Sequence, residues 1–519
     1  MAAGASRWMP ASLLFPTPIT CRRNRPAARG DRPRFLSRPP GRIFGAVYSR
    51  LTAPLIGPVS VAACGSRCIL ASLSRRAVSA TPAAALRREL GVRDLTLFAV
   101  TAIVGTRWIA ASARAGPGSV VLWLLAAVFV IVPLAIAVAA LTIKYPGTGG
   151  LYLWTRRDFG PWHGFLCFWV YWLGMAFWFP SAAMFYMSVG FHTLGPRYAH
   201  LADSRPWLLA VSLAAIWIAL GTNLVGLRVG KWTQNIGGSA TWMLGIVLVA
   251  AAALVWARHG SATRLDPRPV WNWDTLSFWA VMAYGMSGME LAGLMGAEIR
   301  DPARTLPRAA WIASATATAF YASSTLALLV VLAPERINEL YGLADGGAAA
   351  AGTLGISWLG PLVGVLVMAS AVGQFGGIGT AVSRLPLAAG VDHLLPAAFG
   401  RIHARWATPH ISILTLGAVS SFLLVAIQAG DTMRAAYQAL VSLMLIGGFL
   451  PYLYIYASAF RAGKRWSASA GFAMSVFALF CSLIPGAEVH NAWLFEAKLA
   501  LGTAAMVGSA WLIYRRHRG

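Results

Sequence analysis

The chain is poor in charged residues for its length. Of its 519 residues, 12% are charged and 58% are hydrophobic, whereas about 25% of the residues of soluble domains are charged. The apolar residues lie in runs of about 20, the length that a helix needs to cross a hydrocarbon core about 30 Å thick. Segments of about ten residues that alternate between apolar and polar, typical of outer-membrane barrels, are absent. The sequence therefore predicts an all-α polytopic membrane protein in contact with a lipid bilayer.

Motifs for catalysis and for nucleotide binding are absent as well. The sequence contains no HExxH, no GxSxG and no Walker loop, the signatures of metalloproteases, serine hydrolases and nucleotide-driven proteins. Its five cysteines indicate no disulfide framework, and Cys64 and Cys68 lack a second pair with which to hold zinc. We therefore predict a protein that is not an enzyme and has no catalytic residues, no metal site and no cofactor.

Acidic residues are scarce, which gives a formal net charge of +26. Much of this charge lies in residues 1–86, which hold 13 arginines, no lysine and one acid, Asp31. A nucleic-acid partner would need basic clusters on a folded face, and none is visible, so no such partner is expected. We interpret residues 1–86 as an Arg/Pro/Ala-rich tail, either a disordered extension or an overlong gene start, with an organellar transit peptide as the alternative.

A membrane domain is predicted from residue 87 to residue 519. It contains twelve apolar spans of membrane-crossing length. The spans cover residues 94–115, 119–142, 162–190, 206–226, 233–257, 275–297, 308–333, 355–380, 410–429, 435–458, 467–486 and 494–514. Spans one and six both carry helix-weakening residues near their centres. Their separation by five spans suggests two inverted five-helix repeats, at 94–257 and 275–458, followed by two extra helices at 467–514.

The loops between the spans differ in basic charge. If the residues before the first span lie inside, the inside loops hold 20 Lys and Arg residues and the outside segments hold nine. Basic residues collect on the cytoplasmic side of membrane proteins. Both termini are therefore predicted to be cytoplasmic, which agrees with the even number of spans.

The centre of the first span carries a charge deep in the membrane. Gly105 and Thr106 precede Arg107, about 13 residues into a 22-residue helix, and a charge at that depth costs about 3 kcal/mol even on the mildest insertion scale. Arg107 and freed backbone N–H groups are suited to binding a substrate carboxylate. The alternative is a structural ion pair between Arg107 and Glu290, and the two roles can coexist.

The sixth span has a second weak point. Gly285 and Gly288 flank Ser287, so the helix can open there and free backbone groups that a membrane tolerates only where they line a cavity or face protein. Glu290 then lies at the start of the continuing half-helix, where the helix dipole favours an anion. We expect it to bind a cationic part of the substrate or to exchange a proton. The alternative is a carboxylate that only ties span six to a neighbouring helix.

The third span is rich in aromatic residues. They are Phe165, Phe168, Trp169, Tyr171, Trp172, Phe177, Trp178 and Phe179. Such residues could wall a substrate cavity, because aromatic faces attract ammonium groups. Lipid contact or helix packing is their more common role and is the interpretation that we favour.

Four blocks of sequence resemble the amino acid–polyamine–organocation transporter superfamily. Lys144 to Tyr152, followed by Phe159-Gly160-Pro161, resembles its YPxxGGxYxW…FGP, and Gly288-Met289-Glu290 with residues 298–308 resembles its GxE…GEIxNPxRxxPRA. Ser383-Arg384 with residues 392–396 resembles SRxxxAxxRDxLLP, and Thr408-Pro409 precedes span nine. The likeness extends over about residues 90–515.

The resemblance implies a five-plus-five inverted-repeat fold with broken helices 1 and 6, and transport by alternating access. By this likeness Ile103, Val104, Gly105, Thr106 and Arg107 match a carboxylate-binding stretch, and Tyr284, Gly285, Ser287, Gly288 and Glu290 match an amine-binding stretch. In one branch the acid matching Glu290 is linked to pH response, which makes it the candidate for proton coupling. The first stretch departs from the usual GxGIF and is closer to the glutamate/GABA antiporter branch, which also carries an arginine there. Thr241 stands where proton-coupled members have a lysine.

We therefore predict a secondary active transporter of amino acids or related amines in the inner membrane of a bacterium. The alternatives are a proton-linked amino acid/amine exchanger of the glutamate/GABA type and a membrane sensor that binds amino acids without moving them. The expected partners are a small-molecule substrate and the lipid bilayer, and a homodimer is left open.

Overall fold

The computed structural model describes residues 90–147, 149–296, 299–391, 393–406, 408–428, 432–486, 489 and 491–518. The predicted tail, residues 1–86, lies outside these ranges. The described chain is built from helices, and within it an isolated bridge joins Leu90 to Ile299 without forming a strand.

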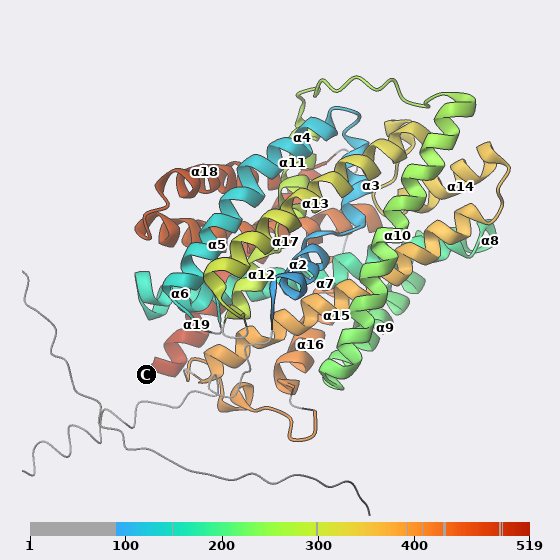
Figure 1. The fold of residues 1–519 in the computed structure, drawn as a ribbon. Coiled ribbons are helices and arrows are strands. Elements are labelled where there is room, and N and C mark those ends of the chain that lie inside the picture. Colours follow the sequence, from blue (N-terminus) through green and yellow to red (C-terminus); the bar gives the residue numbers. More distant parts are fainter. Residues whose placement is uncertain are drawn as a thin grey trace, which may run out of the picture. The chain divides into compact units, whose positions relative to one another are not determined.

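The helices follow one another along the chain, mostly with short connections, and a longer one joins α10 to α11 (Figure 1). They are α2 (Val92–Ile103), α3 (Arg107–Arg114), α4 (Ser119–Ala126), η2 (Ala127–Ile131), α5 (Val132–Lys144), α6 (Leu151–Phe159), α7 (Pro161–Thr193), α8 (Pro196–Ala199), η3 (His200–Ala202), α9 (Arg205–Leu224), α10 (Leu227–His259), α11 (Trp273–Gly285), α12 (Met289–Leu294), α13 (Pro302–Val331), η5 (Pro334–Arg336), α14 (Gly342–Leu354), α15 (Leu359–Val391), η6 (Ala397–Gly400), α16 (His410–Ile427), α17 (Met433–Arg461), α18 (Arg465–Ser482) and α19 (Ala492–Arg518).

The predicted spans correspond closely to these helices. In the described part of the chain, nine helices are long and apolar enough to cross a membrane, and the bent pair α2 and α3 makes up to ten. Predicted spans six and eleven correspond to the pair α11 and α12 and to the 18-residue α18, which fall outside that set. The all-helical fold with many spans is therefore confirmed, whereas the count of twelve and the inverted repeats stay predictions.

Gly160 sets the angle between α6 and α7. Its φ is +95°, in the left-handed region that favours glycine, and it both ends α6 and precedes α7. Pro161 occupies the first position of α7, where the first N–H groups have no partner within the helix and a missing N–H costs nothing. The Phe159-Gly160-Pro161 motif therefore turns the short α6 into the long α7.

Helix α7 lies at the centre of the bundle. Most of its side chains are buried, and it packs against α9, α15, α16, α17 and α19. Its approach to α17 is close because Gly174 faces Gly447, and a Cβ on either residue would lie 2.4–2.8 Å from the backbone of the other. Gly237 and Gly373 form a similar crossing between α10 and α15, the pair at the right of Figure 1. Small residues thus let the central helices meet backbone to backbone.

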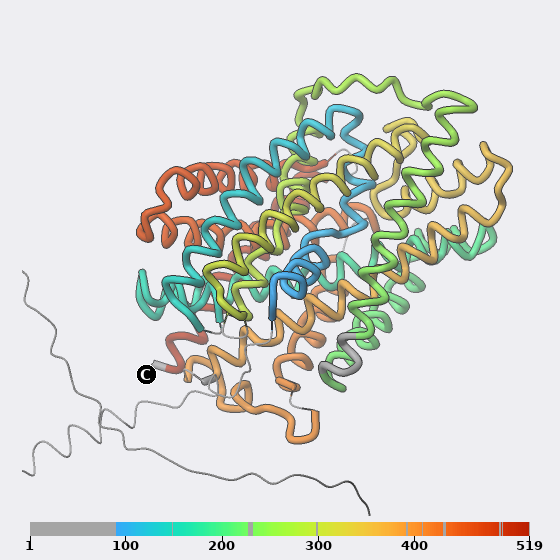
Figure 2. Tube along the Cα trace, in the orientation of Figure 1, coloured from blue at the N-terminus to red at the C-terminus, as the bar shows by residue number. Residues whose placement is uncertain are grey.

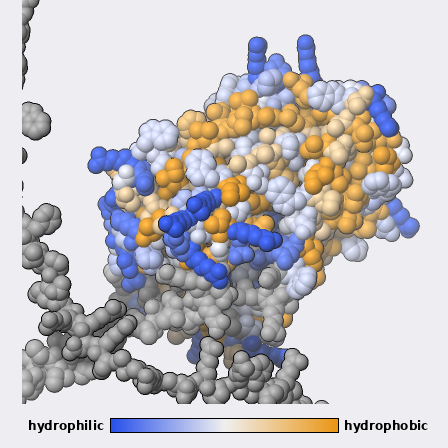
Figure 3. Space-filling view, in the orientation of Figure 1, coloured by the Kyte–Doolittle hydropathy of each residue, from blue (hydrophilic) through white to orange (hydrophobic). Residues whose placement is uncertain are grey.

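The outer surface is suited to a lipid bilayer. Large apolar side chains such as Ile218 and Phe422 are exposed, and in Figure 3 apolar side chains cover the middle of the visible face while hydrophilic ones gather at its margins. Several exposed tryptophans lie close to helix ends, among them Trp207, Trp232, Trp256, Trp273, Trp466 and Trp493. Tryptophan at this position is typical of the membrane–water interface.

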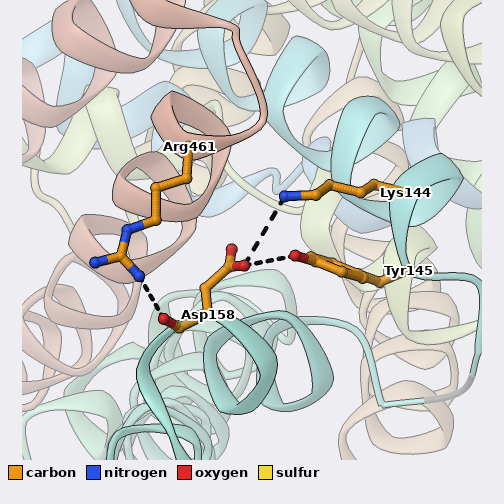
Figure 4. Close-up of polar contacts among 4 residues, drawn as sticks. All are labelled: Lys144, Tyr145, Asp158 and Arg461. Atoms are coloured by element: carbon orange, nitrogen blue, oxygen red, sulfur yellow. Dashed lines mark hydrogen bonds and ion pairs between the residues drawn. The ribbon is translucent and has the colours of Figure 1, made fainter.

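A polar cluster joins α5, α6 and α17 where α5 ends (Figure 4). The Tyr145 hydroxyl donates a hydrogen bond to the Asp158 carboxylate at 2.5 Å, and Lys144 Nζ lies 3.9 Å from the same oxygen. Arg461 of α17 donates to the Asp158 backbone carbonyl and lies over the Phe159 ring at 4.1 Å. The block that resembles the superfamily between spans two and three therefore fixes the α5–α7 connection to α17.

Candidate functional site

The first predicted break is present between α2 and α3. Helix α2 ends at Ile103, α3 begins at Arg107, and the two helices are bent by 50°. Val104 is extended, with φ −74° and ψ 99°. Figure 2 follows the blue trace of the chain through this bend. The residues between the two helices leave backbone groups outside the helical hydrogen-bond pattern.

The second predicted break lies between α11 and α12. Helix α11 ends at Gly285 and α12 begins at Met289. Gly288 has φ +120°, a conformation that side-chain-bearing residues rarely adopt. Glu290 is the second residue of α12, as the sequence predicted.

The two breaks pack directly against each other. A Cβ on Gly288 would lie 2.9 Å from the Ala102 carbonyl oxygen and 3.2 Å from the Ile103 nitrogen. Position 288 therefore requires glycine for two reasons: a Cβ would be too close to the first break, and the backbone has a positive φ. The two weak points of the sequence thus lie in direct contact. All ten predicted site residues, Ile103 to Arg107 and Tyr284, Gly285, Ser287, Gly288 and Glu290, are buried there.

Tyr321 of α13 forms hydrogen bonds to both breaks, and it was not among the site residues predicted from the sequence. Its hydroxyl accepts a hydrogen bond from the Gly105 N–H at 2.8 Å and lies within donating distance of the Ile103 carbonyl at 2.8 Å and the Gly285 carbonyl at 3.2 Å. Its ring stacks on Trp123 with centroids 4.2 Å apart and planes 3° from parallel. Gly105 and Ile103 precede Tyr321 by more than 200 residues, and a tyrosine in an apolar span does not indicate such distant contacts.

Arg107 is buried at the first break, with 1% of its surface exposed. Its Nη1 donates to Ser181 Oγ at 2.7 Å and its Nη2 lies 3.1 Å from Met444 Sδ, a weak acceptor. The guanidinium lies over the Trp108 ring at 3.9 Å and 5.3 Å from the centroid of Trp178. Its Nε has no hydrogen-bond partner among the described residues.

The alternative of an ion pair between Arg107 and Glu290 is wrong for this structure. Within the described residues no carboxylate pairs with Arg107. Arg107 turns instead to Ser181 of α7, and Glu290 turns to Tyr171 of the same helix. Ten residues separate these partners, or about 15 Å along a helix.

Glu290 has two hydrogen-bond donors. Its Oε1 accepts from the Tyr171 hydroxyl at 2.7 Å, and its Oε2 accepts from the Gly288 N–H at 2.9 Å. The second donor is a backbone N–H freed by the break. The carboxylate therefore gives this N–H an acceptor, and the N–H gives the carboxylate a donor. A buried carboxylate held in this way is compensated without a cation.

Two of the eight aromatic residues that the sequence marks in α7 reach the site. Tyr171 contacts Glu290 and Trp178 lies beside Arg107. Of the eight aromatic residues predicted in this helix, all except Trp169 are buried. Helix packing is therefore their main role and lipid contact is not, whereas a cavity-wall role for Tyr171 and Trp178 stays a prediction.

Tyr284 of α11 packs against Trp108, the residue that follows Arg107. It is buried, and its ring meets Trp108 edge to face with centroids 6.4 Å apart. Its hydroxyl makes no hydrogen bond of ordinary geometry with the described residues.

Comparison with known proteins identifies the chain's relatives. The sequence model of one family, described as amino acid permease, matches residues 90–501. The chain belongs to the amino acid permease family. An uncharacterized transporter of Legionella pneumophila is 24% identical to this permease over 83% of this chain and 97% of its own length. The serine/threonine exchanger SteT of Bacillus subtilis is 24% identical over 63% of this chain and 74% of its own.

A solved structure has a similar fold. This permease matches the crystal structure of MhsT in complex with L-phenylalanine with a TM-score of 0.52 and 16% sequence identity, over 81% of this chain and 98% of that one. The predicted membership of the amino acid–polyamine–organocation superfamily is thus confirmed. This permease is a multi-pass membrane transporter and not an enzyme.

Proposed function

We propose that this permease is a secondary active transporter that carries amino acids or related amines by alternating access, with the substrate bound between the two breaks. The observation that carries the proposal is the burial of Arg107 without a carboxylate partner among the described residues. An arginine side chain keeps its proton in proteins, so its charge cannot be removed on burial. A buried charge is costly unless it is paired, and a substrate carboxylate would supply the pair.

The polar groups around Arg107 support this assignment. Arg107 Nε and the Tyr284 hydroxyl have no protein partner within the described residues. Ser181 and the Trp108 ring hold the guanidinium in place before any ligand arrives. Preorganised donors lower the cost of ordering the site when the substrate binds.

Glu290 has a different part in the proposal. Its two donors already compensate its charge, and its partner Tyr171 lies about 15 Å along α7 from Ser181, the partner of Arg107. The two charged groups are thus held at different levels of α7. The substrate amine therefore faces the freed carbonyls of the second break near Tyr284, and Glu290 is the group that exchanges a proton.

The names of the relatives support amino acids as substrates. SteT is named for serine and threonine, and MhsT was solved with L-phenylalanine. The finer features belong to the same proposal: twelve spans with two inverted five-helix repeats, both termini in the cytoplasm, and the inner membrane of a bacterium as the location. The excess of basic residues in the loops on one side supports that orientation.

The test is uptake by the purified permease reconstituted in liposomes. Each radiolabelled amino acid and each corresponding decarboxylated amine is offered to wild-type liposomes, to liposomes with Arg107→Met and to protein-free liposomes. Saturable uptake of at least one amino acid by the wild type, absent from the variant, is expected. Counterflow into liposomes preloaded with unlabelled amino acid would identify exchange. Saturable binding of an amino acid without flux would contradict transport and favour the sensor.

A further inference from the structure

An apolar groove lies on the outside of the bundle, between α7, α17, α18 and α19. Its first part has a volume of about 330 Å³ and is lined by residues that include Leu166, Val170, Leu450, Tyr454, Phe472 and Val507. A second part of about 420 Å³ shares Ala457 and Phe472 with the first and continues to Phe460 and Arg461 at the end of α17. Phe460 and Phe472 are exposed, so the groove opens on the outer surface of the bundle.

The length of the groove matches one leaflet of a bilayer. It extends along α17 from Leu450, near the middle of that helix, to Arg461, its last residue. Eleven residues separate these two positions, or about 16 Å along a helix. A hydrocarbon core is about 30 Å thick. An apolar groove that covers half of this thickness has the length and the chemistry to hold one acyl chain of a phospholipid.

Two arginines lie at the end of the groove where α17 finishes. The Arg461 guanidinium lies 4.1 Å from the centroid of the Phe159 ring, and the Arg465 guanidinium lies 5.9 Å from the centroid of the Phe460 ring. Both rings line the groove, and both arginines are exposed. Lys464 lies between them in the sequence. The groove therefore ends in a concentrated positive charge.

The neighbouring acid, Asp158, turns its carboxylate away from this charge. Figure 4 shows Arg461 donating to the Asp158 backbone carbonyl, while the carboxylate faces Lys144 and Tyr145. A guanidinium has five N–H donors, so one bond to a carbonyl leaves others for a further acceptor. The planar fork of an arginine matches the oxygens of a phosphate group.

We propose that the groove binds an anionic phospholipid, with one acyl chain along α17 and the phosphate at Arg461 and Arg465. Basic pockets between membrane helices are suited to anionic headgroups. Charge argues against two other occupants. A twofold dimer formed through the groove would bring the same arginines of two copies together, and residues 1–86, with 13 arginines and one acid, would be repelled.

The test adds defined lipids to the purified full-length protein after its own lipids have been removed in detergent. Dioleoyl phosphatidylglycerol is compared with dioleoyl phosphatidylcholine, which has the same chains and no net charge, and with glycerol 3-phosphate, which has the charge and no chain. At about 100 times its dissociation constant, phosphatidylglycerol alone is expected to raise the melting temperature by a few degrees. Native mass spectrometry is expected to detect bound phosphatidylglycerol. No substrate is needed, so the result is independent of the proposed function.

Two variants locate the lipid. Arg461→Gln removes one charge at the end of the groove and is expected to weaken phosphatidylglycerol binding by roughly fivefold or more. Ala457→Phe keeps every charge but fills the groove where its two parts meet, and is expected to weaken the same binding. The matched controls are Arg405→Gln, at an exposed arginine before α16, and Ala253→Phe, at an exposed alanine of α10. Both controls are expected to bind like the wild type.

Several results would overturn the proposal. Equal stabilisation by the two phospholipids would show that the headgroup charge is not recognised, and stabilisation by glycerol 3-phosphate would reduce the groove's end to a site for soluble anions. Binding by Arg461→Gln or Ala457→Phe that equals binding by its control would place the lipid elsewhere. Dimers of the lipid-free wild type that Ala457→Phe abolishes would make a second copy the occupant. If Arg461→Gln fails to fold, Arg465→Gln, at an exposed side chain, is expected to weaken binding in the same way and decides instead.

Discussion

The two breaks at the centre of the permease differ in how the charge of their ionisable residue is compensated. At the first break the freed backbone carbonyls have hydrogen-bond donors, Gln374 and Tyr321. The charge of Arg107 has no anionic partner there among the described residues, because the guanidinium contacts a hydroxyl and a thioether. At the second, the Gly288 N–H and the Tyr171 hydroxyl both donate to Glu290, so the charge is compensated from within. The difference indicates that the binding free energy of an anionic group is concentrated at the first break.

The contrast also gives the two charges different roles. A guanidinium stays charged, so its compensation has to come from a ligand. A carboxylate can gain and lose a proton, and its protein donors let it remain buried in either case. We therefore expect substitutions at the first break to act on substrate affinity and those at the second to act on pH dependence.

The largest effect is expected from Arg107→Met. Removing the guanidinium should cost about 2–5 kcal/mol of binding free energy, a loss of roughly 30-fold or more in affinity. Because the same change removes an unpaired buried charge, the substrate-free protein should gain about 1–4 kcal/mol in stability. Radiolabelled substrate binding and melting temperature measure the two effects. Arg197→Met, at an exposed arginine of α8, is the control and should change neither.

Gly288→Ala tests the contact between the breaks. A Cβ would meet the Ala102 carbonyl oxygen at 2.9 Å, and φ +120° is strained for alanine. We expect a loss of about 2 kcal/mol or more in the free energy of unfolding, together with loss of transport. Gly221→Ala in α9, where nothing lies within 4 Å of the added Cβ, should be neutral or slightly stabilising. Equal behaviour of the two variants in thermal unfolding would disprove the close packing of the breaks.

Glu290→Gln tests the role of the carboxylate at the second break. The amide oxygen can still accept from Tyr171, but the amide N–H₂ would face the Gly288 N–H, so one donor loses its acceptor. We expect a stability loss of about 1–3 kcal/mol and a flattened pH profile of uptake. Tyr171→Phe, which removes one donor and keeps the carboxylate, should retain a pH-dependent profile. A profile of Glu290→Gln identical to that of the wild type would remove Glu290 from proton coupling.

The smallest effect is expected from Ser181→Ala. Ser181 accepts a hydrogen bond from Arg107 at 2.7 Å and helps to orient the guanidinium. Its loss should weaken substrate binding by about 1 kcal/mol, or roughly fivefold. Ser188→Ala removes a buried hydroxyl from the same helix that has no hydrogen-bond partner among the described residues, and affinity should not change. Equal affinities of the two variants, measured by equilibrium binding, would show that Ser181 does not orient Arg107.

Much of this fold can be predicted from local properties of the sequence. Runs of about 20 apolar residues mark the spans, and glycines beside a charge mark the breaks, so the limits of α2, α3, α11 and α12 lie close to those expected. The burial of α7 could not be predicted in this way. Its aromatic residues fit a lipid-facing helix as well as a central one, and only the crossing at Gly174 and Gly447 places it in the middle.

The partners within the site depend on long-range packing. Ser181, Tyr321 and Gln374 lie 74 to 270 residues from the groups that they contact at the first break. Single hydroxyl or amide groups are common in membrane helices, so nothing in the sequence distinguishes these three. The alternative of an ion pair between Arg107 and Glu290 is wrong for the same reason. Two opposite charges at neighbouring breaks suggest a pair, but each finds its partner at a different level of α7.

The most direct test of the central claim compares an amino acid with its carboxamide. The substrate found by uptake, and the same molecule with its carboxylate converted to an uncharged amide, are each titrated into the wild type and Arg107→Met by calorimetry. If Arg107 is left unpaired for the substrate carboxylate, the acid binds the wild type at least roughly 30-fold more tightly than the amide, and the variant does not discriminate between them. Equal affinities of acid and amide for the wild type would contradict the account.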